Sequence, residues 1–195
     1  MRIFGVILAG GQGRRMGGAD KALVMLAGQS LIARAVARLE PQVERLAVSA
    51  NGDPARLTGL GLPILPDLDP QGPLSGVLAA LTWAGAQGAD AVVSVPVDCP
   101  FFPGDLVPRL HLAAEMTGIS LARSGGNLHP TCALWPVSLA GALSEFLGSG
   151  VNARVRDFAE AHGAAVADFP DDGAFANLNT PADLSRAEAL IAGDP

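Results

Sequence analysis

Short apolar runs and helical patterns alternate along the whole chain. Apolar runs predict strands, and apolar residues that recur every three or four positions predict helices. The predicted strands cover residues 3–8, 45–49, 63–66, 91–95, 119–123, 131–135 and 165–169. The predicted helices cover residues 30–39, 75–86, 103–115, 137–147, 151–162 and 181–192. Ser30 and Thr180 are predicted N-caps, and Asp105 is a further start signal. This alternation predicts an α/β fold with a mostly parallel sheet covered on both faces.

The carboxyl ends of the predicted strands carry most of the candidate chemistry. In an open parallel sheet, ligands bind beyond the carboxyl ends of the strands. A glycine-rich segment follows Leu8, and Asn51, Asp67 and Asp98 each follow a further predicted strand. We therefore expect all four to line one rim of the sheet.

Length and composition favour a single domain over residues 1–195. A chain of 195 residues, 49% of them hydrophobic, can bury one substantial core, whereas two full domains would be cramped. The formal net charge of −6 disfavours a nucleic-acid partner, because general nucleic-acid binders are basic. No apolar stretch approaches the roughly 20 residues of a membrane span, and the first apolar run does not end in a cleavage site. The two cysteines form no CxxC pattern, which indicates a reducing, cytoplasmic location.

The segment Leu8–Lys21 has the composition of a phosphate-binding loop. It is not a Walker A loop, because Lys21 is preceded by aspartate and followed by alanine. It is not a dinucleotide fingerprint that starts at Gly11, because Met16 stands where the last glycine is required. Its glycine N–H groups can approach phosphate closely, its arginines can fork onto phosphate, and Lys21 is the only lysine in the chain. This combination predicts a site for a nucleoside triphosphate and for the pyrophosphate that leaves it.

Asp98 is the candidate magnesium ligand. It follows the predicted strand 91–95 and lies between Pro96 and Pro100, which restrict the backbone on both sides. A carboxylate at a rigid strand end suits Mg²⁺, which usually takes its other ligands from phosphates and water. The alternative role of such an aspartate is a turn or helix cap.

Several other side chains have roles that the sequence leaves open. The Asp67 carboxylate can accept hydrogen bonds from a guanine edge or a ribose hydroxyl, or it can serve only a turn. Asn179 is a candidate metal or ligand contact. His129 has no second histidine at metal-ligand spacing, which disfavours zinc, and it is interpreted as a structural or exposed loop residue. Cys99 is interpreted as a buried thiol, because no His-Asp constellation is evident around it.

The ordered set of motifs resembles the nucleotidyltransferases that activate sugar phosphates and related compounds. Within that group it is similar to the molybdenum cofactor guanylyltransferases, the MobA family. The resemblance covers nearly the whole chain and is carried by the segments Leu8–Lys21, Ser49–Asn51, Pro66–Asp67, Gly72–Gly76, Pro96–Pro100, His129–Thr131 and Asn177–Thr180. It implies a three-layer α/β/α, Rossmann-like fold of the nucleotide-diphospho-sugar transferase type.

The resemblance also implies roles for individual residues. The implied nucleotide-binding residues are Leu8, Ala9, Gly10, Gly11, Lys21, Ser49, Asn51, Asp67, Gly76 and Asp98. Lys21 would bind the phosphates with help from Arg15, Asp98 would hold Mg²⁺, and these three are the implied catalytic residues. The segment His129–Thr131, with Asn177 and Asn179, would lie toward the pterin.

One position bears on the choice of base. The related cytidylyltransferases typically read Leu-Ala-Ala-Gly where this chain reads Leu-Ala-Gly-Gly. Gly10 therefore favours guanine, because the absent side chain leaves room for a purine.

The resemblance implies direct transfer of GMP from GTP. The terminal phosphate of molybdopterin would attack the α-phosphorus of GTP, release pyrophosphate and form the guanine dinucleotide cofactor. Positioning and charge neutralisation by Mg²⁺, Lys21 and Arg15 would suffice, without a protein nucleophile. Other cofactor-biosynthesis proteins and apo-molybdoenzymes are implied partners, whereas nucleic acid and membranes are not.

Two alternatives stay open at the level of sequence. Cytidylyl or sugar-phosphate transfer would use the same loop with another nucleotide or another acceptor. A nucleotide-binding carrier that hands the finished cofactor to a molybdoenzyme would bind the same ligands without releasing pyrophosphate.

Overall fold

A computed structural model describes residues 1–10, 20–66, 72–150 and 154–193 of the chain. Its centre is a seven-stranded sheet with the strand order β5-β4-β1-β6-β8-β7-β9. The strands are β1 Ile3–Leu8, β4 Leu46–Ala50, β5 Ile64–Pro66, β6 Ala91–Pro96, β7 Ser120–Ser124, β8 Asn127–Pro136 and β9 Ala165–Phe169. A separate two-stranded ribbon pairs β2, Met25–Leu26, with β3, Gln29–Ser30. The α/β class predicted from the sequence is confirmed.

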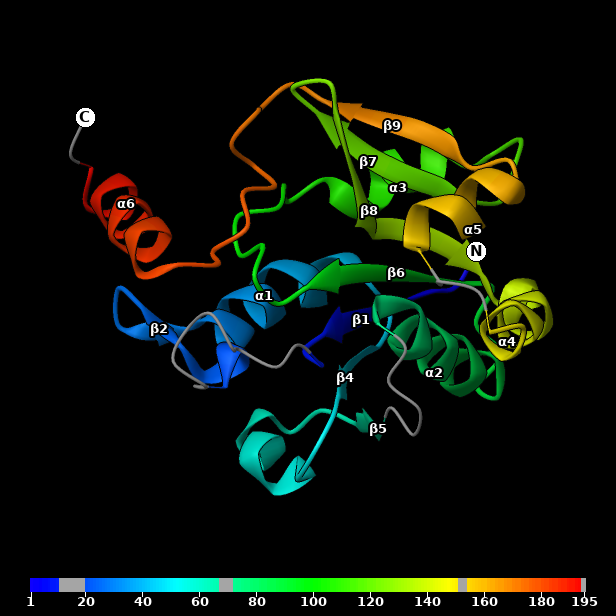
Figure 1. The fold of residues 1–195 in the computed structure, drawn as a ribbon, viewed down its shortest axis with the longest axis horizontal. Helices are drawn as coiled ribbons and strands as arrows, with labels where there is room; N and C mark the ends of the chain where they lie inside the picture. The colour runs from blue at the N-terminus through cyan, green and yellow to red at the C-terminus, as the bar shows by residue number, and fades with distance from the viewer. Residues whose placement is uncertain (11–19, 67–71, 151–153, 194–195) are drawn as a thin grey trace.

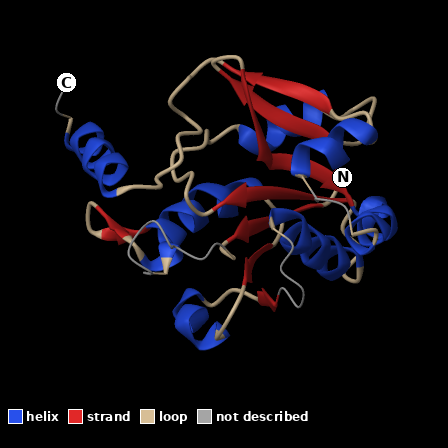
Figure 2. Ribbon diagram, viewed as in Figure 1, coloured by secondary structure: helices blue, strands red, loops and turns tan. Residues whose placement is uncertain are grey.

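Helices cover both faces of the large sheet (Figures 1 and 2). The α-helices are α1 Leu31–Leu39, α2 Pro73–Gly85, α3 Leu106–Ala113, α4 Ala140–Gly148, α5 Val155–Ala161 and α6 Pro181–Ala192. Short 3₁₀ helices are η2 Lys21–Leu23, η3 Glu40–Gln42, η4 Pro54–Leu60 and η5 Val137–Leu139. One face of the sheet packs on α1 and α3, and the other packs on α2, α4 and α5. The three layers are therefore α, β and α, as the family resemblance implies.

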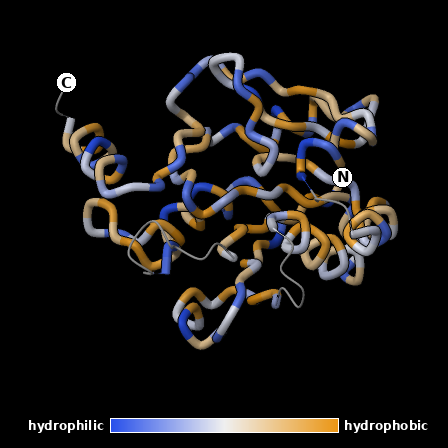
Figure 3. Tube along the Cα trace, in the orientation of Figure 1, coloured by the Kyte–Doolittle hydropathy of each residue, from blue (hydrophilic) through white to orange (hydrophobic). Residues whose placement is uncertain are grey.

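Alternate residues of the central strands supply the two hydrophobic cores. Phe4 and Val6 of β1 join the core under α2, whereas Ile7 joins the core under α1. Gly5 faces α1 too, and a Cβ there would lie 3.0 Å from Leu39 Cδ2. Burial on both faces explains why the central strands are almost wholly apolar, as the hydropathy colouring shows (Figure 3).

Six of the seven sheet strands run in one direction, and β8 is the antiparallel one. The strands β5, β4, β1 and β6 pair in parallel, β8 pairs antiparallel with both β6 and β7, and β9 pairs in parallel with β7. The predicted strand 131–135 begins four residues earlier in the structure, at Asn127. Its extra residues pair with β7 across a hairpin turn in which Gly125 and Gly126 have φ of 53° and 76°. His129 therefore lies in a strand, and its interpretation as a loop residue was wrong.

Helix boundaries differ from the predictions where capping and proline act. The second helix begins at Pro73 rather than residue 75, because proline suits the first turn of a helix. The third helix spans only Leu106–Ala113, and the Asp105 side chain caps no backbone N–H. Instead, Asp105 Oδ2 accepts a hydrogen bond from Arg109 Nε at 2.5 Å. The predicted helix 137–147 is divided into η5 and α4. Residues 151–153 of the predicted helix 151–162 lie outside the described residues, and the described helix is α5, which begins after the extended N-cap residue Arg154.

The other two cap predictions are confirmed. Ser30 Oγ accepts a hydrogen bond from Ala33 N at 3.3 Å, and Thr180 forms a capping box with Asp183 at the start of α6. Among the described residues, the longest helices are too short or too polar to reach across a lipid bilayer.

Candidate active site

The carboxyl ends of β1, β4 and β6 form one rim, as predicted. Ala9 N donates to Ser49 O at 2.8 Å, and Val97 N donates to Leu8 O at 3.1 Å, so the chain continues side by side beyond the strand ends. This brings together three of the four rim features: the start of the glycine-rich segment, Asn51 and Asp98. The fourth, Asp67, lies outside the described residues, as do Gly11 and Arg15.

Lys21, Asp98 and Asn179 meet at this rim. Lys21 Nζ lies 2.6 Å from Asp98 Oδ2 and also donates a short hydrogen bond to Asn179 Oδ1. The Lys21 and Asp98 side chains are only 14% and 21% exposed. In such partial burial an ion pair is weakly screened by salt, so the ammonium group is held firmly between the two oxygens. The sequence predicted Lys21 and Asp98 for one site, and they are in direct contact.

Asn179 reaches the site from the far edge of the sheet. After β9 the chain crosses back over the rim toward β6 before α6 begins (Figure 1). Leu178 N donates to Asp98 O at 2.8 Å, which joins this returning segment to the Asp98 loop. The capping box of α6 then fixes the next residue, because Asp183 Oδ2 accepts hydrogen bonds from Asn179 N at 3.0 Å and Thr180 N at 2.8 Å. Asn177, two residues earlier, is exposed.

The local fold around Lys21 depends on its neighbour Asp20. Asp20 is the N-cap of η2, and its Oδ1 accepts a hydrogen bond from Ala22 N at 3.1 Å. The other carboxylate oxygen forms an ion pair with Arg56 Nη1. Neither residue was among the predicted site residues. Asp20 was noted only as the acidic neighbour of Lys21, and Arg56 had no signal in the sequence, because it lies five residues after Asn51 in a turn-rich segment.

Asn51 contacts the first glycine of the phosphate loop. Its Nδ2 donates to Gly10 O at 3.2 Å, and its backbone carbonyl accepts from Arg56 Nη2 at 2.9 Å. A Cβ on Gly10 would lie 3.1 Å from Asn51 Nδ2, so an alanine at position 10 would press on this amide. Asn51 Oδ1 is buried and has no hydrogen-bond partner in the described part of the chain. A buried acceptor of this kind is available to a donor from a ligand or from water.

Ser49, Gly76 and Leu8 pack together beneath the rim. A Cβ on Gly76 would lie 2.7 Å from Ser49 Oγ and 3.0 Å from Leu8 Cδ2, so glycine allows the first turn of α2 to lie directly on the ends of β1 and β4. Ser49 is 3% exposed and Ala9 is 4% exposed. The structure thus places these predicted nucleotide-binding residues in the layer that supports the rim.

His129 lies in a half-buried cluster near the start of β8. Its ring stacks on Phe175 with the centroids 4.7 Å apart, and its Nε2 lies 2.9 Å from Ser124 Oγ. Burial lowers the pKa of His129, so the ring is neutral at pH 7. Because Phe175 belongs to the same returning segment as Asn179, the cluster connects the β7–β8 hairpin to that segment.

Both cysteines are free and buried. Cys99 and Cys132 are each 1% exposed. The interpretation of Cys99 as a buried thiol is confirmed. A hydrogen bond with Cys99, together with burial, raises the pKa of the Cys132 thiol well above its usual range, so this thiol stays protonated and unreactive.

Asp98 and Asn179 offer hard oxygen donors for a metal ion. No group of three or more His, Cys, Asp or Glu side chains gathers around one point within the described ranges. Asp98 and Asn179 nevertheless direct a carboxylate and an amide oxygen at the same cation, the Lys21 ammonium group. These are oxygen ligands of the kind that Mg²⁺ uses when phosphates and water complete its shell.

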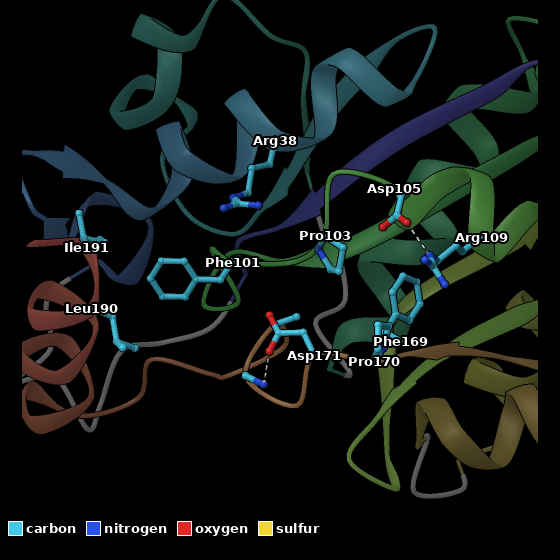
Figure 4. Close-up of a pocket in the computed structure, with 12 residues that line it drawn as sticks. Arg38, Phe101, Pro103, Asp105, Arg109, Phe169, Pro170, Asp171, Leu190 and Ile191 are labelled. Carbon is cyan, nitrogen blue, oxygen red and sulfur yellow. Dashed lines mark hydrogen bonds and ion pairs between the residues drawn. The ribbon is translucent and has the colours of Figure 1, made fainter. Parts of the chain in front are cut away.

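A separate groove of about 810 Å³ lies between α1, α3, α6 and the segment after β9 (Figure 4). It is lined by Arg38, Phe101, Pro103, Asp105, Arg109, Phe169, Pro170, Asp171, Gly173, Ala174, Leu190 and Ile191, none of which is a predicted site residue. Its charged groups already have partners within the protein: Arg109 pairs with Asp105, Arg38 donates to Phe102 O, and Asp171 accepts from Gly173 N. These contacts hold the charged groups in place, and the groove contains none of the residues that the sequence predicted for the site.

Comparison with known proteins identifies the family. The model of the MobA-like NTP transferase domain matches residues 5–166. The chain belongs to the MobA-like NTP transferase family. Nucleotidyltransferases of this kind generally use a divalent metal ion.

Individual relatives agree with this assignment to the MobA-like family. A protein of Cereibacter sphaeroides named molybdenum cofactor guanylyltransferase is 61% identical over 194 residues, which cover 100% of both chains. A protein of the same name from Rhodobacter capsulatus is 51% identical over 195 residues, covering 96% of each chain. The solved structure of molybdopterin-guanine dinucleotide biosynthesis protein A from Archaeoglobus fulgidus superposes with a TM-score of 0.72 at 24% identity, covering 97% of this chain and 99% of that one. The predicted family, fold and nucleotidyltransferase activity are confirmed.

Proposed function

We propose that the protein transfers GMP from GTP to the terminal phosphate of molybdopterin, forming the guanine dinucleotide cofactor and releasing pyrophosphate. The observation that carries this proposal is the meeting of Lys21, Asp98 and Asn179 at the rim where the glycine-rich segment begins. The full-length similarity to proteins named molybdenum cofactor guanylyltransferase supports the choice of nucleotide and acceptor.

The reaction is a direct displacement at phosphorus. An oxygen of the acceptor phosphate forms a bond to the α-phosphorus of GTP, and the bond between that phosphorus and the bridging oxygen of the β-phosphate breaks. The leaving pyrophosphate carries the electron pair and the added negative charge. Lys21, which Asp98 and Asn179 hold at the rim in the structure, can stabilise this charge.

We propose that Mg²⁺ is the metal ion and that Asp98 and Asn179 hold it together with the phosphates. When bound, the ion would neutralise phosphate charge and polarise the attacked phosphoryl group. Lys21 would then contact the phosphates of GTP. Asp98 and Asn179 would hold the metal ion with the same two side-chain oxygens that contact the Lys21 ammonium group in the structure.

Guanine selection is proposed to rest on Gly10 and Asn51. Asn51 Oδ1 is a buried acceptor without a partner in the described residues, and guanine offers ring and exocyclic N–H donors. Gly10 lets Asn51 Nδ2 reach the backbone carbonyl of residue 10, which fixes the amide with its oxygen free. An alanine at position 10 would displace this amide. Glycine at position 10 therefore has two proposed roles: it leaves room for a purine, and it allows Asn51 Nδ2 to reach Gly10 O.

The remaining predicted roles are part of the proposal. Arg15 assists Lys21, Gly11 and Asp67 contact the nucleotide, and the product passes to apo-molybdoenzymes. Leu8, Ala9, Ser49 and Gly76 shape the support on which the nucleotide lies.

The deciding experiment measures pyrophosphate release by the purified protein. We expect release with GTP, Mg²⁺ and molybdopterin together, and none when any of the three is omitted. In direct competition, GTP should be consumed in preference to CTP. Preferential use of CTP would overturn the guanylyl assignment, and binding of GTP and molybdopterin without pyrophosphate release would identify a carrier.

A further inference from the structure

Arg56 stands between the two ends of the glycine-rich segment. Its Nη1 forms an ion pair with Asp20, and its Nη2 donates to Asn51 O at 2.9 Å. Asn51 in turn holds Gly10 O through its side-chain amide at 3.2 Å. One guanidinium group is therefore connected to Gly10 on one side and to Asp20 on the other.

The pairing of Arg56 with Asp20 is largely shielded from water. Both side chains are 24% exposed, and the two paired atoms, Arg56 Nη1 and Asp20 Oδ2, are buried and have no other partner in the described residues. Loss of either member of such a pair leaves an uncompensated charge in a poorly solvated place. The pair is thus a specific structural link and not a screened surface contact.

We propose that Arg56 is a positioning residue for GTP, which sets the placement of Lys21 relative to Gly10. Arg56 fixes the Asp20 carboxylate, Asp20 caps η2, and η2 begins with Lys21. Through Asn51 the same guanidinium fixes the backbone at Gly10. The inference rests on the proposed function, because it assigns Arg56 to the triphosphate-binding rim.

Arginine is suited to this role for a geometric reason. The planar guanidinium donates in two directions at once, here to a carboxylate and to a carbonyl. Lysine would keep the charge opposite Asp20 but would not reproduce this fixed fork. Arg56→Lys should therefore recover only part of what Arg56→Ala loses.

The test combines steady-state kinetics with a double-mutant cycle. Arg56→Ala should raise the KM for GTP about tenfold, with a smaller change in kcat, because it loosens positioning without removing a group that touches the phosphates. Asp20→Ala should have a similar effect. The double variant should be about as impaired as either single variant, because both remove the same link. Arg45→Ala is the matched control, since Arg45 contacts Gln87 at the opposite end of β4.

A second readout does not depend on the reaction. The amide hydrogen of Ala22, which donates to Asp20 Oδ1, should exchange with solvent faster in Arg56→Ala than in the parent protein without nucleotide. If the parent protein shows no GTP turnover, the proposed function is refuted. Faster Ala22 exchange in Arg56→Ala would in that case still support the positioning of η2 by Arg56. Unchanged Ala22 exchange together with an unchanged KM would overturn the inference, and so would single effects that multiply to about a hundredfold in the double variant.

Discussion

At the scale of single residues, Lys21 is held by two groups of different chemistry. Asp98 supplies a charge and Asn179 supplies a neutral oxygen, so the ammonium group is oriented without being fully neutralised. An amine held in this way is ready to move toward phosphates that carry several negative charges. Its position, and not only its charge, is what the surrounding fold provides.

Replacing Lys21 or Asp98 by alanine should lower turnover by about a hundredfold or more, the usual loss for one electrostatic donor at a reacting phosphoryl or acyl centre. The measurement is the rate of pyrophosphate release with GTP, Mg²⁺ and molybdopterin at saturation. Asp105→Ala is the matched control, because Asp105 pairs with Arg109 on α3 and should leave turnover unchanged. Near-normal rates in both Lys21→Ala and Asp98→Ala would refute the assigned roles.

At the scale of elements, α6 holds Asn179 in place through its N-terminal cap. Hydrogen bonds from Thr180 and from the backbone of Asn179, with the Arg186 guanidinium, lower the pKa of Asp183 to about 2. The folded-state pKa lies below the ordinary value of 3.8, so the ionised carboxylate is favoured by folding. The stabilisation is therefore complete above the ordinary pKa and is lost as the pH falls toward 2.

The protonation of the Asp183 carboxylate should be observable by NMR. In a pH series followed by NMR, the amide signals of Asn179 and Thr180 should shift with a midpoint of about 2, since both amides donate to Asp183 Oδ2. Asp183→Asn is the control, because its side chain does not titrate and the shift should disappear. A midpoint at 3.8 would show that the capping box does not bias the carboxylate.

Elements whose signals are local were predictable from the sequence. The buried strands β1 and β6 match their predicted ranges within one residue, and α6 matches at both ends because Thr180 marks its start. Elements that depend on distant partners were not. The extension of β8 and its antiparallel direction come from pairing with β7 and β6, which no periodicity in residues 127–130 reveals.

The candidate site was also predictable only in part: residues at strand ends were predicted, and contacts made by distant segments were not. The rim rule brought Asp98 and Asn51 to the start of the glycine-rich segment, because each follows a parallel strand. It could not predict that Asn179 contacts Lys21, since the returning segment after β9 crosses two strands to reach β6. Arg56 escaped notice because its partners are set by the path of η4 and not by its spacing from Asn51.

At the scale of the whole molecule, we propose that residues 1–195 form one domain that unfolds cooperatively. The two hydrophobic cores lie on opposite faces of one sheet, and neighbouring residues of the same strands serve both of them. A substitution that destabilises one core should therefore also destabilise the other, because both cores pack on the same strands.

Leu110→Ala, in the core under α3, should destabilise the protein by about 2–5 kcal/mol, because it leaves a cavity at a fully buried site. Both tryptophans, Trp83 and Trp135, belong to the opposite core. Their fluorescence in a urea titration should nevertheless report a lower midpoint, in agreement with circular dichroism. Leu74→Ala, on the tryptophan side, is the comparison variant. If Leu110→Ala left the fluorescence midpoint unchanged, the two faces would unfold separately.

The scarcity of lysine in this chain makes the rim a unique site for labelling a side-chain amine. Lys21 is the only lysine, and its side chain is 14% exposed between two oxygens. An acylating reagent therefore meets a single side-chain amine in addition to the chain terminus, and adding one acyl group there converts the rim cation into a neutral amide. Because the terminus gains the same mass, the peptide that contains Lys21 is the one to measure, and a nucleotide that engages this amine would protect it from the reagent.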